Sequence, residues 1–134
     1  YKVIVITNQS GISRGYYDEA TLDKIHKKMH QLTAEKGGTI DAIFYCPHGP
    51  DDHCACRKPK PGLLTQFAKE NNTSLKDIYF IGDKQGDAQA AIAAGAKPML
   101  VKTGTKKNTF NHHSDINCPI FEDLYDAATY ILSR

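Results

Sequence analysis

Apolar runs and amphipathic segments alternate along the chain. Short runs rich in β-branched and aromatic residues, which are typical of strands, cover residues 2–7, 40–45, 77–81 and 98–102. Between and after them, the spacing of apolar residues and the positions of Gly and Pro predict helices at residues 18–36, 62–71, 88–94 and 124–133. This alternation predicts an α/β fold with a parallel, doubly wound, Rossmann-like sheet, in a single domain of residues 1–134.

The longest helical segment has the clearest amphipathic pattern. Its apolar residues predict a buried stripe formed by Leu22, Ile25, Met29 and Leu32. Asp18 and Glu19 stand at its start, where acidic residues suit the helix dipole. The pair Gly37-Gly38 predicts its end.

Three polar loops follow predicted strands. They contain Asn8-Gln9-Ser10, the cysteine- and histidine-rich segment 46–60, and Gly82-Asp83-Lys84. In open parallel sheets, ligands bind beyond the carboxyl ends of the strands. We therefore expect these loops to gather at one edge of the sheet.

Composition narrows the class of protein. The chain has 134 residues, of which 40% are hydrophobic and 24% charged, as in one globular domain. Its formal charge of +2 is too small for a strong nucleic-acid footprint, and no apolar run approaches the ~20 residues that cross a bilayer. The sequence shows no signal-peptide pattern. We expect a cytoplasmic monomer that binds neither nucleic acid nor membrane.

The segment YCPHGPDDHCACRKPKP gathers soft metal ligands in one loop. Three thiols and one imidazole are a typical tetrahedral zinc set, and the short spacing lets the two pairs converge: Cys46, His48, Cys54 and Cys56. The alternatives are scattered buried cysteines or a disulfide, which a cytosolic protein disfavours. His53 competes with His48 as fourth ligand, whereas Cys118 is expected to be a buried or incidental thiol.

Two cations follow the last cysteine directly. A zinc clip would fix the backbone of Arg57 and Lys58 and aim both side chains at a phosphate, which Arg binds as a fork and Lys as a point charge. The alternative is a solvated basic stretch that also contains Lys60.

The segment GDKQGD supplies complementary acids. Asp83 follows an apolar strand and a glycine, and its carboxylate could hold Mg²⁺ while leaving the ion free to bind phosphate. Asp87 could be a second ligand or could support the metal. Alternatively, Asp83 is a helix N-cap and Lys84 a surface cation. Thr7, with the amides that follow it, could cradle phosphate oxygens or form a polar turn.

Together, the segments VITNQSGISRG, YCPH…CACRKPKPG and FIGDKQGDAQAA resemble the haloacid-dehalogenase superfamily of phosphatases, over nearly all of the first 105 residues. Thr7 and Lys58 match its phosphoryl-binding residues. Asp83 matches its acidic Mg²⁺ ligand, with Asp87 as a weaker match that supports the metal. The implied substrate contacts are Asn8, Gln9, Ser10, Arg57 and Lys84, and the implied structural zinc ligands are Cys46, His48, Cys54 and Cys56.

The chain lacks one sequence motif of the superfamily. The motif Asp-x-Asp-Gly-Thr, which supplies the attacking aspartate and the general acid/base, does not occur in the chain. The chain also begins at Tyr1, inside an apparent strand. We therefore expect an N-terminally incomplete domain that lacks its first strand, exposes pairing edges, and is inactive alone. The implied reaction passes through an aspartyl-phosphate and uses Mg²⁺.

Within the superfamily, the pattern is most similar to phosphatases of heptose 1,7-bisphosphate and their relatives, the histidinol-phosphatases. Ser10 and Arg14 in TNQSGISRG favour the heptose group, and the several cations suit a small sugar bisphosphate. Low net charge argues against the related polynucleotide 3′-phosphatases. A different class stays open, namely a zinc-stabilised module that binds phosphate without hydrolysing it. Residues 105–115 are expected to be a polar, mobile loop in which His112 and His113 are exposed.

Overall fold

A computed structural model describes residues 1–104 and 117–134. These residues form two compact units, the first unit (Tyr1–Arg57) and the second unit (Lys58–Arg134). The predicted polar loop with His112 and His113 lies outside the described residues. That all 134 residues act as a single domain stays a prediction.

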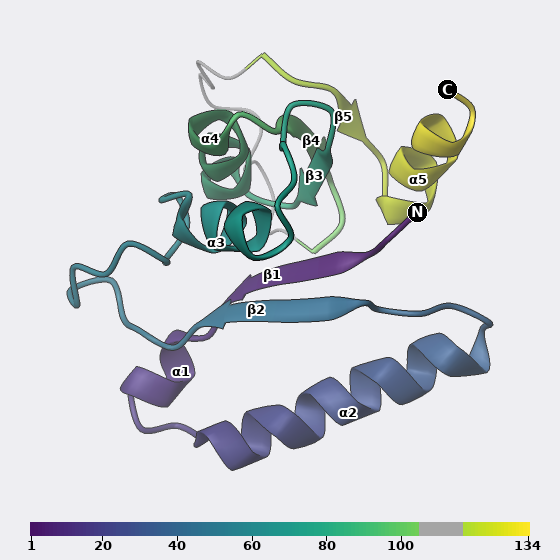
Figure 1. The fold of residues 1–134 in the computed structure, drawn as a ribbon. Helices are drawn as coiled ribbons and strands as arrows, with labels where there is room; N and C mark the ends of the chain where they lie inside the picture. The colour runs from purple at the N-terminus through teal and green to yellow at the C-terminus, as the bar shows by residue number, and fades with distance from the viewer. Residues whose placement is uncertain (105–116) are drawn as a thin grey trace. The chain divides into compact units, whose positions relative to one another are not determined.

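The first unit is built on a pair of parallel strands (Figure 1). Its elements are β1 (Ile4–Asn8), α1 (Ser10–Ser13), α2 (Glu19–Glu35) and β2 (Ala42–Cys46). The register places Ile4 beside Ala42 and Asn8 beside Cys46. Because the strands are parallel, the loops after Asn8 and after Cys46 leave the pair at the same end, where the Gln9 N–H donates to the Cys46 carbonyl at 2.7 Å.

Helix α2 begins as the sequence predicts, but only part of its predicted apolar face is packed. The Asp18 carboxylate accepts a hydrogen bond from the Thr21 N–H at 2.8 Å, which lowers the pKa of Asp18. Leu22 is buried and Met29 half-buried, whereas Ile25 and Leu32 are each 50% exposed, so the predicted stripe is wrong at these two positions. His26 contributes to the packing instead, because its ring lies edge-on to the Tyr45 ring with 5.9 Å between the two ring centres. The packed face is rotated toward His26, a residue that counts as polar in a sequence pattern.

The second unit has a parallel sheet with helices on both faces. Its elements are α3 (Gly62–Glu70), β3 (Tyr79–Gly82), α4 (Gln85–Ala94), β4 (Lys97–Val101), β5 (Ile120–Phe121) and α5 (Leu124–Leu132), with strand order β3-β4-β5. Helices α3 and α4 lie on one side and α5 on the other (Figure 1). On the α5 side, Met99, Val101 and Ala127 form a buried cluster. Helix α4 ends at Gly95, whose φ of +83° suits glycine.

Every strand pair in the described residues is parallel, which confirms the α/β prediction. Two short elements were not predicted, α1 and the two-residue β5, because such lengths leave no periodic pattern. Helix α4 also begins at Gln85, earlier than the predicted start.

No helix in the described ranges combines the length and the apolar character needed to cross a bilayer. Cys118 carries a free, half-buried thiol whose pKa is raised by burial.

Candidate active site

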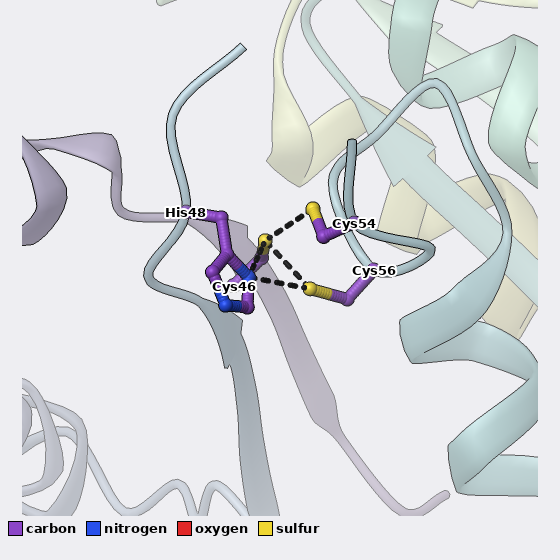
Figure 2. Close-up of side chains that lie close together, drawn as sticks. All are labelled: Cys46, His48, Cys54 and Cys56. Atoms are coloured by element: carbon purple, nitrogen blue, oxygen red, sulfur yellow. Dashed lines mark hydrogen bonds between the residues drawn. The ribbon is translucent and has the colours of Figure 1, made fainter. Parts of the chain in front are cut away.

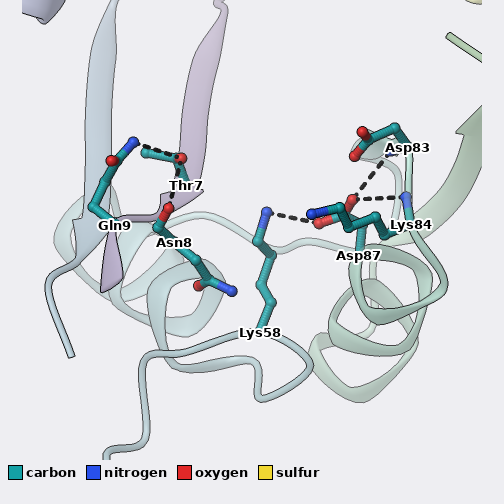
Figure 3. Close-up of polar contacts among 7 residues, drawn as sticks. All are labelled: Thr7, Asn8, Gln9, Lys58, Asp83, Lys84 and Asp87. Atoms are coloured by element: carbon teal, nitrogen blue, oxygen red, sulfur yellow. Dashed lines mark hydrogen bonds and ion pairs between the residues drawn. The ribbon is translucent and has the colours of Figure 1, made fainter. Parts of the chain in front are cut away.

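The second unit holds a buried ion pair at the end of β3 (Figure 3). Lys58 Nζ lies 2.6 Å from Asp87 Oδ1, and the two side chains are 15% and 8% exposed. The same ammonium lies 5.8 Å from the centre of the Phe80 ring. Asp87 Oδ2 accepts from the backbone N–H groups of Asp83 and Lys84, each at 3.1 Å. Both oxygens of Asp87 are therefore engaged, and its carboxylate fixes the lysine and the loop together.

Asp83 presents a carboxylate that no described residue pairs with or donates to. The backbone N–H of Asp83 is held by the Asp87 carboxylate. Asp83 Oδ2 lies close to Gly104, since a Cβ added at Gly104 would be 2.9 Å from that oxygen. Lys84 is exposed at the start of α4. A fixed carboxylate with free oxygens is a suitable ligand for Mg²⁺. The predicted alternative for Asp83, a helix N-cap, does not describe this chain, because the cap residue of α4 is Lys84.

The approach of Asp87 to the strand depends on Gly82. A Cβ added at Gly82 would lie 2.2 Å from the Asp87 Cβ and 2.3 Å from its Oδ2. Gly82→Ala should therefore lower the free energy of unfolding by about 3 kcal/mol, since the side chain that holds Lys58 must move. Denaturant unfolding measures this change.

The matched control for that substitution is Gly86→Ala, where the nearest atoms to a new Cβ, in Pro59, are 3.9 Å away. Alanine there should be neutral or stabilising, because it favours helix α4. Equal unfolding free energies for the two variants would contradict the importance of the close approach of the Asp87 side chain to Gly82.

The first unit carries polar groups at the end of β1 (Figure 3). Gln9 Nε2 donates to Thr7 Oγ1 at 3.2 Å, and the Thr7 hydroxyl lies 3.4 Å from the Asn8 carbonyl. Ser10 opens α1 directly afterwards. The segment thus offers a hydroxyl, amides and a helix start within four residues, which is chemistry that suits an oxyanion.

The four predicted metal ligands come together in the same unit (Figure 2). All of their ligand atoms lie within 4.8 Å of one another. Cys46 Sγ is 3.5 Å from His48 Nδ1, 3.5 Å from Cys54 Sγ and 2.7 Å from Cys56 Sγ. With zinc–sulfur bonds of about 2.3 Å, a tetrahedral site has sulfur atoms about 3.8 Å apart. The Cys46–Cys56 pair must therefore open by about 1 Å, and the Cys46–Cys54 pair by about 0.3 Å. His53 is exposed and lies outside this group.

The thiols of the cluster differ in their acidity. Burial, with the neighbouring thiols, raises the pKa of Cys56 to about 12. Burial also acts to raise the pKa of Cys54, but hydrogen bonds from the Arg57 backbone and from Cys46 and Cys56 outweigh it and lower that pKa to about 6. A thiolate at Cys54 is thus favoured beside a protonated thiol at Cys56. Binding of a metal to all three sulfur atoms must release protons.

Two further contacts fix the cysteine loop. Asp52 Oδ2 accepts from the Gly49 N–H at 2.7 Å and from the Ser13 hydroxyl at 3.1 Å, and these bonds lower the pKa of Asp52. The loop is therefore tied to α1. Sequence patterns did not indicate Asp52 or Ser13, since their bond joins positions 39 residues apart.

Arg57 carries an unsatisfied donor. Its Nη1 is buried and has no hydrogen-bond partner among the described residues. A buried guanidinium N–H without an acceptor is costly unless an anion completes it. Arg14, by contrast, is exposed at the end of α1.

The sequence profile of the HAD-hydrolase-like family matches residues 55–127. Among curated proteins, the chain is similar to D-glycero-beta-D-manno-heptose-1,7-bisphosphate 7-phosphatase from Pseudomonas putida, with 49% identity over 124 residues (92% of this chain and 71% of that protein). The enzyme of the same name from Pseudomonas aeruginosa is 48% identical over 132 residues, covering 98% and 74% of the two chains.

Two solved structures are similar to nearly the whole chain. The D,D-heptose 1,7-bisphosphate phosphatase from B. bronchiseptica, complexed with magnesium and phosphate, aligns with a TM-score of 0.93 and 45% identity, covering 98% of this chain and 74% of that chain. A putative HAD-like phosphatase from Mesorhizobium loti aligns with a TM-score of 0.79 and 26% identity, covering 98% and 65%.

Proposed function

The chain belongs to the HAD-like hydrolase family, and on that premise we propose that it serves a magnesium-dependent phosphatase that removes the 7-phosphate of D-glycero-D-manno-heptose 1,7-bisphosphate. The observation that carries the proposal is the buried Lys58–Asp87 pair, because Asp87 fixes a cation and the backbone of Asp83 with one carboxylate. The relatives' names support the choice of a heptose bisphosphate over histidinol phosphate.

We assign the roles of the chain's own residues as follows. Lys58 stabilises the negative charge that develops on the phosphoryl group, and Thr7 donates its hydroxyl proton to a phosphoryl oxygen. The unsatisfied Nη1 of Arg57 supports a contact with a substrate phosphate. The remaining substrate contacts are Asn8, Gln9, Ser10 and Lys84.

Two metal ions fit the residues present. The free carboxylate of Asp83 suits Mg²⁺, with Asp87 holding the loop in place, and magnesium once bound would neutralise charge on the phosphoryl group. The donor set Cys46, His48, Cys54 and Cys56 suits zinc in a closed, structural role, since it already supplies four ligands. We place the activity in the cytoplasm, where reducing conditions keep such thiols available.

The residues assigned above do not include the nucleophile that attacks the phosphorus. The 134 residues contain no Asp-x-Asp-Gly-Thr segment. Lys58, Thr7 and Asp83 supply binding and charge stabilisation, but none of them supplies the nucleophile. We therefore propose that these 134 residues alone do not release phosphate.

The test is phosphate release from heptose 1,7-bisphosphate and from histidinol phosphate by the product of the complete reading frame, with the 134-residue chain assayed beside it. We expect Mg²⁺-dependent cleavage of the bisphosphate, abolished by EDTA, and no turnover by the 134 residues. A preference for histidinol phosphate would overturn the substrate. Failure with both compounds would leave a zinc-stabilised phosphate-binding module as the better account.

A further inference from the structure

A chain of hydrogen bonds leads from Tyr17 to the end of β1. The phenolic O–H of Tyr17 donates to Gln9 Oε1, and Gln9 Nε2 donates to Thr7 Oγ1 at 3.2 Å. All three residues belong to the first unit. Tyr17 thus contacts the oxygen end of the Gln9 amide and leaves the nitrogen end facing Thr7.

The position of the Tyr17 ring is set by its neighbour Gly11. A Cβ added at Gly11 would lie 2.1 Å from Tyr17 Cε1 and 2.8 Å from Cζ, so the ring rests directly on the glycine. Tyr17 is half-buried there, whereas Tyr16 beside it is 75% exposed. Only one of the two adjacent tyrosines is therefore placed to reach Gln9.

The orientation of the amide decides what the Thr7 hydroxyl can do. A threonine hydroxyl has one proton to donate and lone pairs that accept. When Gln9 Nε2 donates to it, that proton is left for another acceptor, and the Asn8 carbonyl at 3.4 Å is a weak competitor. If the amide turned over, Gln9 Oε1 would face the hydroxyl and take its proton.

We propose that Tyr17 is a positioning residue, which holds the amide of Gln9 so that the Thr7 hydroxyl keeps its proton for a phosphoryl oxygen. This inference rests on the proposed phosphatase function, in which Thr7 contacts the phosphoryl group. Tyr17 itself does not touch the substrate and acts only through Gln9.

Tyr17→Phe in the complete gene product tests the proposal, because it removes the O–H and keeps the ring on Gly11. We expect kcat/KM for the bisphosphate to fall about tenfold, the size of one hydrogen bond, and the inhibition constant of inorganic phosphate to rise by a similar factor. Tyr16→Phe is the matched control and should behave as wild type. An unchanged kcat/KM and phosphate inhibition in Tyr17→Phe would overturn the inference.

A second arm separates an action through Gln9 from a general effect on the fold. In a Gln9→Ala background, Tyr17→Phe should have no further effect on kcat/KM, whereas independent, multiplicative losses would overturn the inference. The side-chain amide resonances of Gln9, followed by NMR, should shift in Tyr17→Phe and not in Tyr16→Phe. Inactivity of the wild-type product would refute the proposed function, a result distinct from an active wild type that Tyr17→Phe leaves unchanged.

Discussion

Lys58→Met should reduce kcat for phosphate release by the complete gene product about 10³-fold. The ammonium is held 2.6 Å from Asp87 in a largely buried position, so it needs little reorganisation to meet the charge of the phosphoryl group. Methionine keeps much of the side chain's volume and contact with Phe80 but removes the charge. Steady-state kinetics at saturating substrate measure the loss.

The same substitution should also affect stability. It leaves the Asp87 carboxylate buried without its cation, which we expect to cost about 3 kcal/mol in the free energy of unfolding. Circular dichroism at the assay temperature must therefore show a folded variant. Lys60→Met, the same change two residues along the loop at an exposed position, is the control and should retain kcat. A loss below tenfold in folded Lys58→Met would refute the assigned role.

Removing zinc should have the second large effect. The purified protein should contain one zinc ion per chain, and a strong chelator should lower the free energy of unfolding by about 5 kcal/mol or more, since structural zinc sites bind with large free energies. The first unit should respond most, because the cluster begins at Cys46, the last residue of β2. Metal analysis and denaturant unfolding with and without chelator measure both quantities.

Cysteine variants locate that effect. Cys46→Ser removes the cluster's fully buried sulfur and should abolish zinc retention and reproduce the chelator's destabilisation. Cys118→Ser removes a thiol outside the cluster and should retain one zinc per chain. Full zinc content in Cys46→Ser, or its loss in Cys118→Ser, would contradict the assignment of ligands.

Local sequence signals predicted much of the fold. Asp18 caps α2, Gly95 ends α4, and the strands follow the apolar runs to within about two residues, because each signal acts on its own neighbourhood. The spacing of the Cys/His segment likewise predicted which side chains converge, since the four ligands stand within eleven residues of one another.

The features that were not predicted depend on partners distant in sequence or on geometry finer than residue type. Ser13 meets Asp52 across 39 positions, and no local pattern indicates such a bond. Tyr17 and Tyr16 are alike in sequence, and only the close approach at Gly11 distinguishes them. Hydrophobicity alone likewise placed Ile25 on the packed face of α2. In the structure Ile25 is half exposed, and His26 packs against Tyr45 instead.

The parallel pairing of β1 with β2 has a consequence for how the first unit folds. Val3 and Asp41, which exchange hydrogen bonds at the start of the pair, are 38 positions apart, and the register keeps this offset throughout. Closing a loop of that length costs about 3 kcal/mol of chain entropy before any strand bond forms, whereas α2 can form locally. Pairing of the two strands, which precedes assembly of the metal site at their carboxyl ends, is therefore expected to follow formation of α2.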